Sequence, residues 1–246
     1  MKGKIIMSET IKNTNAKINA QMEFAIANGG TVWLMTDWHL IRYNKKTGEF
    51  YERDNAATIL RAAVNAIKEN DIVIFMGDLV DSECYTDYPV VALYRKLANI
   101  CSVFEKAKKK YFLIGNNDTE ITKIYKELGF DEAIPCILFR GDIVISHMPF
   151  KCKDAKYNIH GHLHIGDPDL KYIGYWAQYG VEKTRQHINV FNNDRRPVDL
   201  IKDVLEGFCV NGVPNDQAPF ATTDMPKKRN AALLKETKAY YKELKR

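Results

Sequence analysis

The sequence has few cysteines and no long apolar run. Its five cysteines are scattered, odd in number and without a Cys-x-x-Cys pair (Cys84, Cys101, Cys136, Cys152 and Cys209). This usage argues against a disulfide framework or a cysteine zinc site, and it favours reduced thiols in the cytoplasm. The longest apolar runs, such as 72–76, are too short to span a bilayer, and the N-terminus does not have the pattern of a secretory signal. We therefore expect a cytoplasmic protein that makes no membrane contact.

Composition is otherwise that of an ordinary globular protein, and the two ends differ from the middle. The net charge of +5 permits an anionic substrate without requiring nucleic acid. Residues 1–28 have the pattern of a polar helix or a loose tail, and we treat them as an N-terminal extension. Residues 210–226 contain three prolines and are predicted to be a linker. Residues 227–246 form a basic helical pattern, which suits a docked surface helix better than a nucleic-acid contact.

Strands and helices alternate in the first part of the chain, and hairpins follow, which predicts a layered α/β domain. Strands are expected at 31–36, 72–76, 111–114, 135–139, 143–146, 157–160 and 187–191. Helices are expected at 54–69, 90–108, 119–128 and 197–208. We expect Asp54 to cap the first of these helices, with an apolar stripe that includes Leu60 and Val64.

Polar side chains follow most of the predicted strands. The clusters are Asp37-Trp38-His39, Gly77-Asp78-Leu79-Val80-Asp81, Gly115-Asn116-Asn117-Asp118, Ser146-His147 and His160-Gly161-His162-Leu163-His164. In a layered α/β fold the carboxyl ends of strands meet at one edge, so these groups are expected to converge. Carboxylate, amide and imidazole donors suit divalent Mn, Fe, Zn or Ni. The clusters therefore predict a metal site, and a shared carboxylate allows two metals about 3.5–4 Å apart.

The ordered series DxH, GDxxD, GN-x-D, SH and GHxH resembles the calcineurin-like metallophosphoesterase family. The resemblance implies a four-layer αββα sandwich of two mixed β-sheets flanked by helices, occupying residues 29–209. It also implies two metals at the sheet edge and a ligand set. Asp37, His39 and His164 would hold the first metal, Asp78 would bridge, and Asn116, His147 and His162 would hold the second. His160 would support these ligands without binding metal, and Asp81 and Asp118 would shape the loops.

The sequence departs from the family at position 117. Many members have a histidine there that serves as a general acid, whereas this chain has Asn117. An asparagine has no proton to give but can still hydrogen-bond a phosphate oxygen. We therefore expect a phosphodiesterase in which a hydroxide bridging two metals attacks phosphorus in line. Arg42 is a candidate for clamping a phosphate, or equally for a surface salt bridge.

Three functions remain open on the sequence. The first is hydrolysis of a small nucleotide-like or cyclic phosphodiester, with Mn as the expected metal and Fe, Zn or Ni as alternatives. The second is a nuclease acting on DNA or RNA, and the third is a metal-binding scaffold with little turnover. Specificity is expected in the loops at 40–53, 82–90 and 165–185. Their aromatic residues either wall a base-sized pocket or pack the loops down (Tyr85, Tyr88, Tyr172, Tyr175 and Trp176). Oligomeric state is not predicted.

Overall fold

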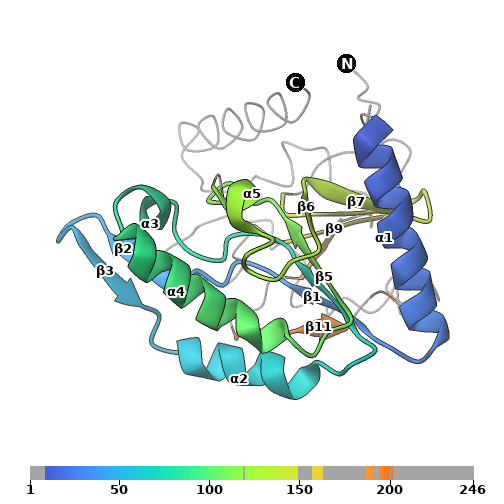
Figure 1. Ribbon diagram of the computed structural model, residues 1–246, viewed down its shortest axis with the longest axis horizontal. Helices are drawn as coiled ribbons and strands as arrows, with labels where there is room; N and C mark the ends of the chain where they lie inside the picture. Colours follow the sequence, from blue (N-terminus) through green and yellow to red (C-terminus); the bar gives the residue numbers. More distant parts are fainter. Residues whose placement is uncertain are drawn as a thin grey trace, which may run out of the picture.

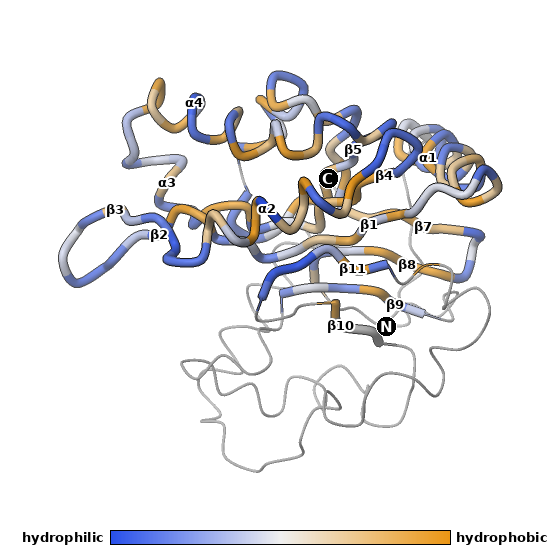
Figure 2. Tube along the Cα trace, turned by 90° about the horizontal axis from the view of Figure 1, so that it is seen from below, coloured by the Kyte–Doolittle hydropathy of each residue, from blue (hydrophilic) through white to orange (hydrophobic). Residues whose placement is uncertain are grey.

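Two β-sheets stacked face to face and flanked by helices form the described part of the chain (Figures 1 and 2). The computed structural model describes residues 9–118, 120–148, 157–162, 187–190, 194–199 and 201. The expected mixed α/β architecture, with two sheets and flanking helices, is confirmed. No helix in these ranges has both the length and the apolar character needed to cross a bilayer.

The first sheet has the order β11-β1-β4-β5-β6. Its strands are β1 (Val32–Met35), β4 (Ile72–Phe75), β5 (Lys109–Leu113), β6 (Glu132–Ile134) and β11 (Val198–Asp199). The four strands from β1 to β6 are parallel, and β11 pairs antiparallel with β1. Because these parallel strands share one direction, the loops after β1, β4 and β5 emerge at one edge.

The second sheet has the order β10-β9-β8-β7. Its strands are β7 (Cys136–Phe139), β8 (Ile143–Ser146), β9 (Tyr157–His160) and β10 (His187–Asn189). The predicted hairpin is confirmed, because β7 and β8 pair antiparallel across the turn at Arg140-Gly141. Strands β8, β9 and β10 are parallel, so the loops after β8 and β9 also emerge together.

Helices and an aromatic cluster cover the outer face of the first sheet. The helices are α2 (Ala56–Ala66), α3 (Glu83–Thr86), α4 (Val90–Cys101), the 3₁₀ helix η1 (Ser102–Phe104) and α5 (Ile121–Ile124). Beneath them Trp38 packs edge-on against Phe75, with ring centroids 5.1 Å apart, and Phe75 stacks on Phe112. Because Trp38 stands between Asp37 and His39, its complete burial ties the first polar cluster to this core.

Helix α1 (Glu9–Ala27) belongs to the core between the two sheets. Its Ile18 and Met22 are fully buried in the cluster that holds Ile74 of the first sheet and Ile145 of the second. The segment 1–28 was expected to be a polar helix or a loose tail; its described part is a helix whose apolar face is docked. Figure 1 shows α1 running along the side of the sandwich next to β7.

Two asparagines of α1 complete the free edge of β7. Asn15 donates from Nδ2 to the Leu138 carbonyl at 2.9 Å and accepts from the Leu138 N–H at 2.8 Å. Asn19 donates to the same carbonyl at 2.9 Å and accepts from the Arg140 N–H at 2.9 Å. An edge strand exposes unpaired backbone groups that attract other strands, and here side-chain amides take their place.

Several predicted helix boundaries were wrong. Asp54 does not cap α2, since the position before the helix is Asn55, whose side chain makes no capping hydrogen bond. The buried stripe of α2 is Ile59 and Ala63, while Val64 is exposed. The helix expected at 90–108 ends at Cys101, and the one expected at 119–128 is reduced to the single turn α5. The helix expected at 197–208 does not begin there, because Val198 and Asp199 form β11.

A β-hairpin that was not predicted follows the first polar cluster. Strands β2 (Ile41–Asn44) and β3 (Glu49–Glu52) form their own two-stranded sheet. Its sequence lacks a clean alternation of apolar and polar residues, which is why the pattern suggested a loop. Of the other expected specificity loops, 82–90 contains α3, and 165–185 lies outside the described residues, as do the predicted linker and the C-terminal helix.

Candidate metal centre

Five strands from both sheets direct polar side chains to one place. Asp37 follows β1, Asp78 follows β4, Asn116 follows β5, His147 follows β8, and His162 follows β9. The loops after β1 and β4 run side by side, because the N–H groups of Asp37 and His39 donate to the carbonyls of Gly77 and Asp78. The site therefore lies where the parallel strands of the two sheets end together.

A compact group of four buried side chains forms the centre. Ligand atoms of Asp37, Asp78, His147 and His162 all lie within 4.8 Å of one another. Each of these residues is at most 8% exposed. Burying two carboxylates next to each other is unfavourable without a compensating positive charge, so this donor set fits a divalent cation.

The Nε2 atom of His147 lies close to donor atoms of three other expected ligands. Its Nε2 lies 2.9 Å from Asn116 Oδ1, 3.1 Å from His162 Nδ1 and 3.5 Å from Asp78 Oδ2. Its Nδ1 donates to the Met76 carbonyl at 2.7 Å, which leaves the Nε2 lone pair of the neutral ring facing these groups. Donor atoms bound to one ion at about 2.1 Å lie about 3 Å apart, so the spacing fits a shared metal.

The electrostatic field at His147 has the sign that attracts a cation. Burial lowers the pKa of His147, but the negative charges of Asp78 and Asp37 outweigh it, and the net pKa is raised. A field that favours a proton on imidazole also favours a divalent ion beside it.

His39 stands on the opposite side of Asp78. Its Nε2 lies 3.5 Å from Asp78 Oδ2, and its Nδ1 lies 2.7 Å from Asp81 Oδ1. Asp81 also accepts a hydrogen bond from the Tyr43 N–H at 3.0 Å. Asp81 thus orients the imidazole of His39 through the nitrogen that points away from Asp78. The remaining expected ligand, His164, lies outside the described residues.

The loop after β5 shapes the centre through hydrogen bonds. Asn117 donates to both oxygens of Asp78, from its backbone N–H to Oδ1 at 3.0 Å and from Nδ2 to Oδ2 at 2.6 Å. Asp118 is fully buried and accepts from the N–H groups of Asp78 and Gly115, at 2.6 and 2.9 Å. Burial and the charge of Asp78 raise the pKa of Asp118. Asp118 therefore holds the loops in place, as predicted.

Four of the expected ligands have left-handed backbone conformations. The φ angles are 55° at Asp37, 43° at His39, 60° at Asp78 and 64° at His162. Non-glycine residues seldom adopt positive φ, and such conformations gather at functional sites where the surrounding structure enforces them. These four side chains are thus held by a backbone conformation that costs folding energy, which the sequence pattern did not reveal.

Two glycines permit the close approach of the loops. A Cβ at Gly115 would overlap Asp78 Oδ1, and a Cβ at Gly161 would overlap Thr36 Oγ1 and lie 2.5 Å from Asp37 Oδ2. Thr36 Oγ1 itself donates to Asp37 Oδ2, which also accepts from the His162 N–H at 2.8 Å. These positions explain why glycine precedes Asn116 and His162 in the sequence.

The other predicted residues lie around the centre rather than in it. Arg42 is on β2, with Nε 4.0 Å from Asp81 Oδ2 and its guanidinium over the ring of Tyr51 at 5.9 Å. His160 is fully buried at the end of β9, and its Nδ1 lies 3.0 Å from the Gly161 carbonyl.

A sequence comparison supplies the observation that decides the family. The sequence model of calcineurin-like phosphoesterases matches residues 30–232, which is most of the chain and includes every expected ligand from Asp37 to His164. The chain belongs to the calcineurin-like phosphoesterase family. Membership identifies it as a metallophosphoesterase, a hydrolase of phosphoesters, and the buried Asp and His residues agree with the divalent metals that this family binds.

Two solved structures resemble this calcineurin-like phosphoesterase. One is a protein of unknown function from Aquifex aeolicus, 18% identical, with a TM-score of 0.46, covering 73% of this chain and 99% of that protein. The other is the nuclease MPE of Pseudomonas putida, 16% identical, with a TM-score of 0.38, covering 54% of this chain and 61% of that protein. No curated protein matches the sequence.

Proposed function

We propose that the protein is a phosphodiesterase that uses two divalent metals, with Mn as the first choice and Fe, Zn or Ni as alternatives. In this proposal Asp37, His39 and His164 hold one metal, and Asn116, His147 and His162 hold the other. Asp78 serves both, since its Oδ2 lies 3.5 Å from both His39 Nε2 and His147 Nε2. When bound, the metals would supply the nucleophile, by lowering the pKa of a water between them, and would neutralise charge on the phosphate.

Asn117 is the observation that carries the choice of a diester. The side chain next to the shared carboxylate donates to Asp78 at 2.6 Å and has no proton to release to a leaving group. General acid catalysis typically contributes about 10²–10⁴-fold, and the loss falls most heavily on poor leaving groups. A diester carries one negative charge where a monoester carries two, so attack by an anion meets less repulsion. These points favour activated or diester substrates over simple monoesters.

We propose a small nucleotide-like or cyclic diester, with the exposed guanidinium of Arg42 near the mouth of the site as a phosphate contact. A scaffold without turnover has no need for two carboxylates buried among imidazoles, so the intact cluster supports an enzyme. The buried thiols of Cys84 and Cys101, which form no disulfide, support a cytoplasmic location.

The test compares two chromogenic substrates, bis(p-nitrophenyl) phosphate and p-nitrophenyl phosphate. The purified full chain is stripped with chelator and then loaded with Mn. Asp78→Asn serves as the inactive control against a contaminating phosphatase. Elemental analysis of the loaded protein gives the number of metals per chain.

Mn-dependent turnover of the diester well above that of the monoester, absent in Asp78→Asn, is the expected result. Faster turnover of the monoester would contradict the proposal, because the centre would then prefer the dianionic substrate over the singly charged diester. Two bound metals without turnover of either substrate would also contradict it and would favour the scaffold.

A further inference from the structure

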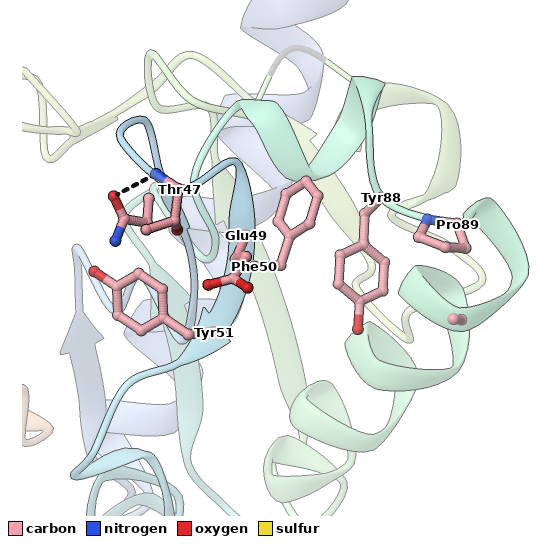
Figure 3. Close-up of a pocket in the computed structure, with 8 residues that line it drawn as sticks. Thr47, Glu49, Phe50, Tyr51, Tyr88 and Pro89 are labelled. Carbon is pink, nitrogen blue, oxygen red and sulfur yellow. Dashed lines mark hydrogen bonds between the residues drawn. The ribbon is translucent and has the colours of Figure 1, made fainter.

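A hollow of about 640 Å³ lies where the β2–β3 hairpin faces the start of α4 (Figure 3). Aromatic side chains of Phe50, Tyr51 and Tyr88 line it together with polar side chains of Asn44, Thr47 and Glu49. Its volume is in the range of small-molecule sites, and its lining combines flat apolar faces with a few hydrogen-bonding groups. No part of the hydrolytic chemistry proposed above uses these residues.

The aromatic residues of the hollow have different degrees of burial. Phe50 packs against Tyr43 and Tyr88, with ring centroids 5.0 and 4.9 Å apart, so it anchors the hairpin to the α3–α4 segment. Tyr51 is 44% exposed, which leaves ring surface available to a ligand. Exposed tyrosine faces of this kind suit the stacking of a planar heteroaromatic ring.

Arg42 connects the hollow with the metal centre. It lies opposite Tyr51 in the hairpin, and its guanidinium lies over the Tyr51 ring. On its other side, Nε faces Asp81, whose second oxygen contacts His39. Arg42 follows His39 by only three residues, so their Cα atoms are within about 11 Å of each other. Within the described ranges Arg42 donates no hydrogen bond, since 4.0 Å to Asp81 is too long for one, and its donors can serve an anion.

The charged groups between the hollow and the metal centre favour one orientation of a bound molecule. The carboxylate of Glu49 in the hollow repels a phosphate but can accept hydrogen bonds from sugar hydroxyls or base amino groups. The guanidinium of Arg42 favours a phosphate, as metals held at the centre beyond it would. A molecule with an uncharged planar end and an anionic end therefore fits in one orientation only.

We propose that the hollow binds a nucleobase of the phosphodiester substrate, with Arg42 contacting a phosphate between the base and the metals. The assignment of this base as part of a substrate rests on the proposed function, whereas binding at the hollow does not. The base belongs to a mononucleotide ester or to a nucleotide chain, and both present the same chemistry to Tyr51 and Tyr88.

The test is equilibrium binding to the metal-loaded full chain by calorimetry. The probes are adenosine 5′-monophosphate, ribose 5-phosphate and a phosphorothioate-linked dinucleotide of deoxyadenosine. Because the first two differ only in the base, their ratio isolates base binding. Stacking of one base on an aromatic side chain corresponds to about a fivefold or greater gain in affinity. We expect at least this advantage for adenosine 5′-monophosphate or for the dinucleotide.

Substitutions test whether the higher affinity for base-bearing probes arises at the hollow. Tyr51→Ala and Tyr88→Ala should each reduce it, whereas Tyr51→Phe should retain it. Tyr94→Ala is the matched control, because Tyr94 lies on α4 at 39% exposure but does not line the hollow. Arg42→Ala should weaken adenosine 5′-monophosphate and ribose 5-phosphate by the same factor. Thermal melting verifies that each variant is folded.

An advantage already present in the mononucleotide supports a mononucleotide ester, and an advantage confined to the dinucleotide supports a nucleotide chain. Equal affinity of all base-bearing probes and ribose 5-phosphate would overturn the proposal, as would an advantage that survives both alanine variants. Base-dependent binding without diester hydrolysis would contradict the phosphodiesterase alone, and hydrolysis without base-dependent binding would contradict the hollow alone.

Discussion

The carboxylate of Asp81 lies 2.7 Å from Nδ1 of His39, while the opposite nitrogen of that ring faces Asp78 at 3.5 Å. Burial raises the pKa of Asp81, but the hydrogen bond from His39 outweighs it, and the net pKa is lowered. Asp81 is therefore ionised and fixes both the orientation and the tautomer of His39. Such carboxylate–histidine pairs determine how well an imidazole binds metal.

Replacing Asp81 should weaken metal binding. Asp81→Ala removes the acceptor that orients His39, and losses of this kind typically lower metal affinity about 10–100-fold. Asp81→Asn should lose less, because its carbonyl still accepts from Nδ1. Calorimetric titration of the chelator-stripped protein with Mn measures the effect. Asp54→Ala, at an exposed carboxylate between β3 and α2, is the matched control, and equal losses in both alanine variants would refute the role of Asp81.

Adding one methyl group at Gly161 should disrupt the centre. In Gly161→Ala the new Cβ would overlap Thr36 Oγ1 and crowd Asp37 Oδ2, so Asp37 must move. We expect metal affinity to fall by about tenfold or more in the same titration. Gly141→Ala separates this effect from backbone strain, because Gly141 has φ +80° in the β7–β8 turn and no atom within 4 Å of the added Cβ. It should lose about 1 kcal/mol of stability and keep its metal affinity.

Removing one asparagine from α1 should destabilise the sandwich. Asn15→Ala leaves the N–H of Leu138 without its side-chain acceptor, which costs about 1–3 kcal/mol if water does not replace it. Urea denaturation measures the difference in the free energy of unfolding. Asn28→Ala serves for comparison, since the side chain of Asn28 donates an exposed hydrogen bond to the Phe24 carbonyl, and this substitution should change stability by less. Equal effects would mean that the edge of β7 does not depend on α1.

The ion pair between Glu23 and Arg140 predicts a small, pH-dependent contribution. Hydrogen bonds from Arg140, at 2.5 and 2.8 Å, hold the pKa of Glu23 below its usual value of 4.5. A lowered folded pKa means stabilisation that is complete above pH 4.5 and is lost as the pH falls through the folded pKa. Because the pair is exposed, Glu23→Gln should cost at most about 1 kcal/mol near pH 7. The difference from wild type should shrink as the pH falls below 4.5, and a difference that does not shrink in acid would contradict the assignment.

The strands and their polar ends could be predicted because both follow from local pattern. Continuous apolar runs such as 72–76 mark parallel strands buried on both faces, and the donors that follow them converge at one edge. The same reasoning brought Asp37, Asp78, His147 and His162 to one place. Both glycine contacts and positive φ angles depend on how loops from different strands meet, and no local pattern carries that information.

The errors have a common cause in tertiary contacts. Val198 and Asp199 were assigned to a helix by local pattern, yet pairing with Leu34 and Trp33 makes them a strand. The polar residues of α1 left open a polar helix or a loose tail, and the pattern did not show that Asn15 and Asn19 bond to the backbone of β7. In α2 the buried residues are Ile59 and Ala63 and not the expected Val64, because the position of the sheet decides which face of the helix is covered. The spacing of apolar residues alone does not give that position.

The docking of α1 also bears on the order in which the protein can fold. Asn15 and Leu138 are 123 residues apart in sequence, so the helix is synthesised long before the strand whose edge it completes. Until β7 has been made, Ile18 and Met22 have no second sheet to pack against, and their apolar face stays exposed on the nascent chain. Such distant pairings slow folding, so during translation the emerging helix is a natural site for chaperone binding.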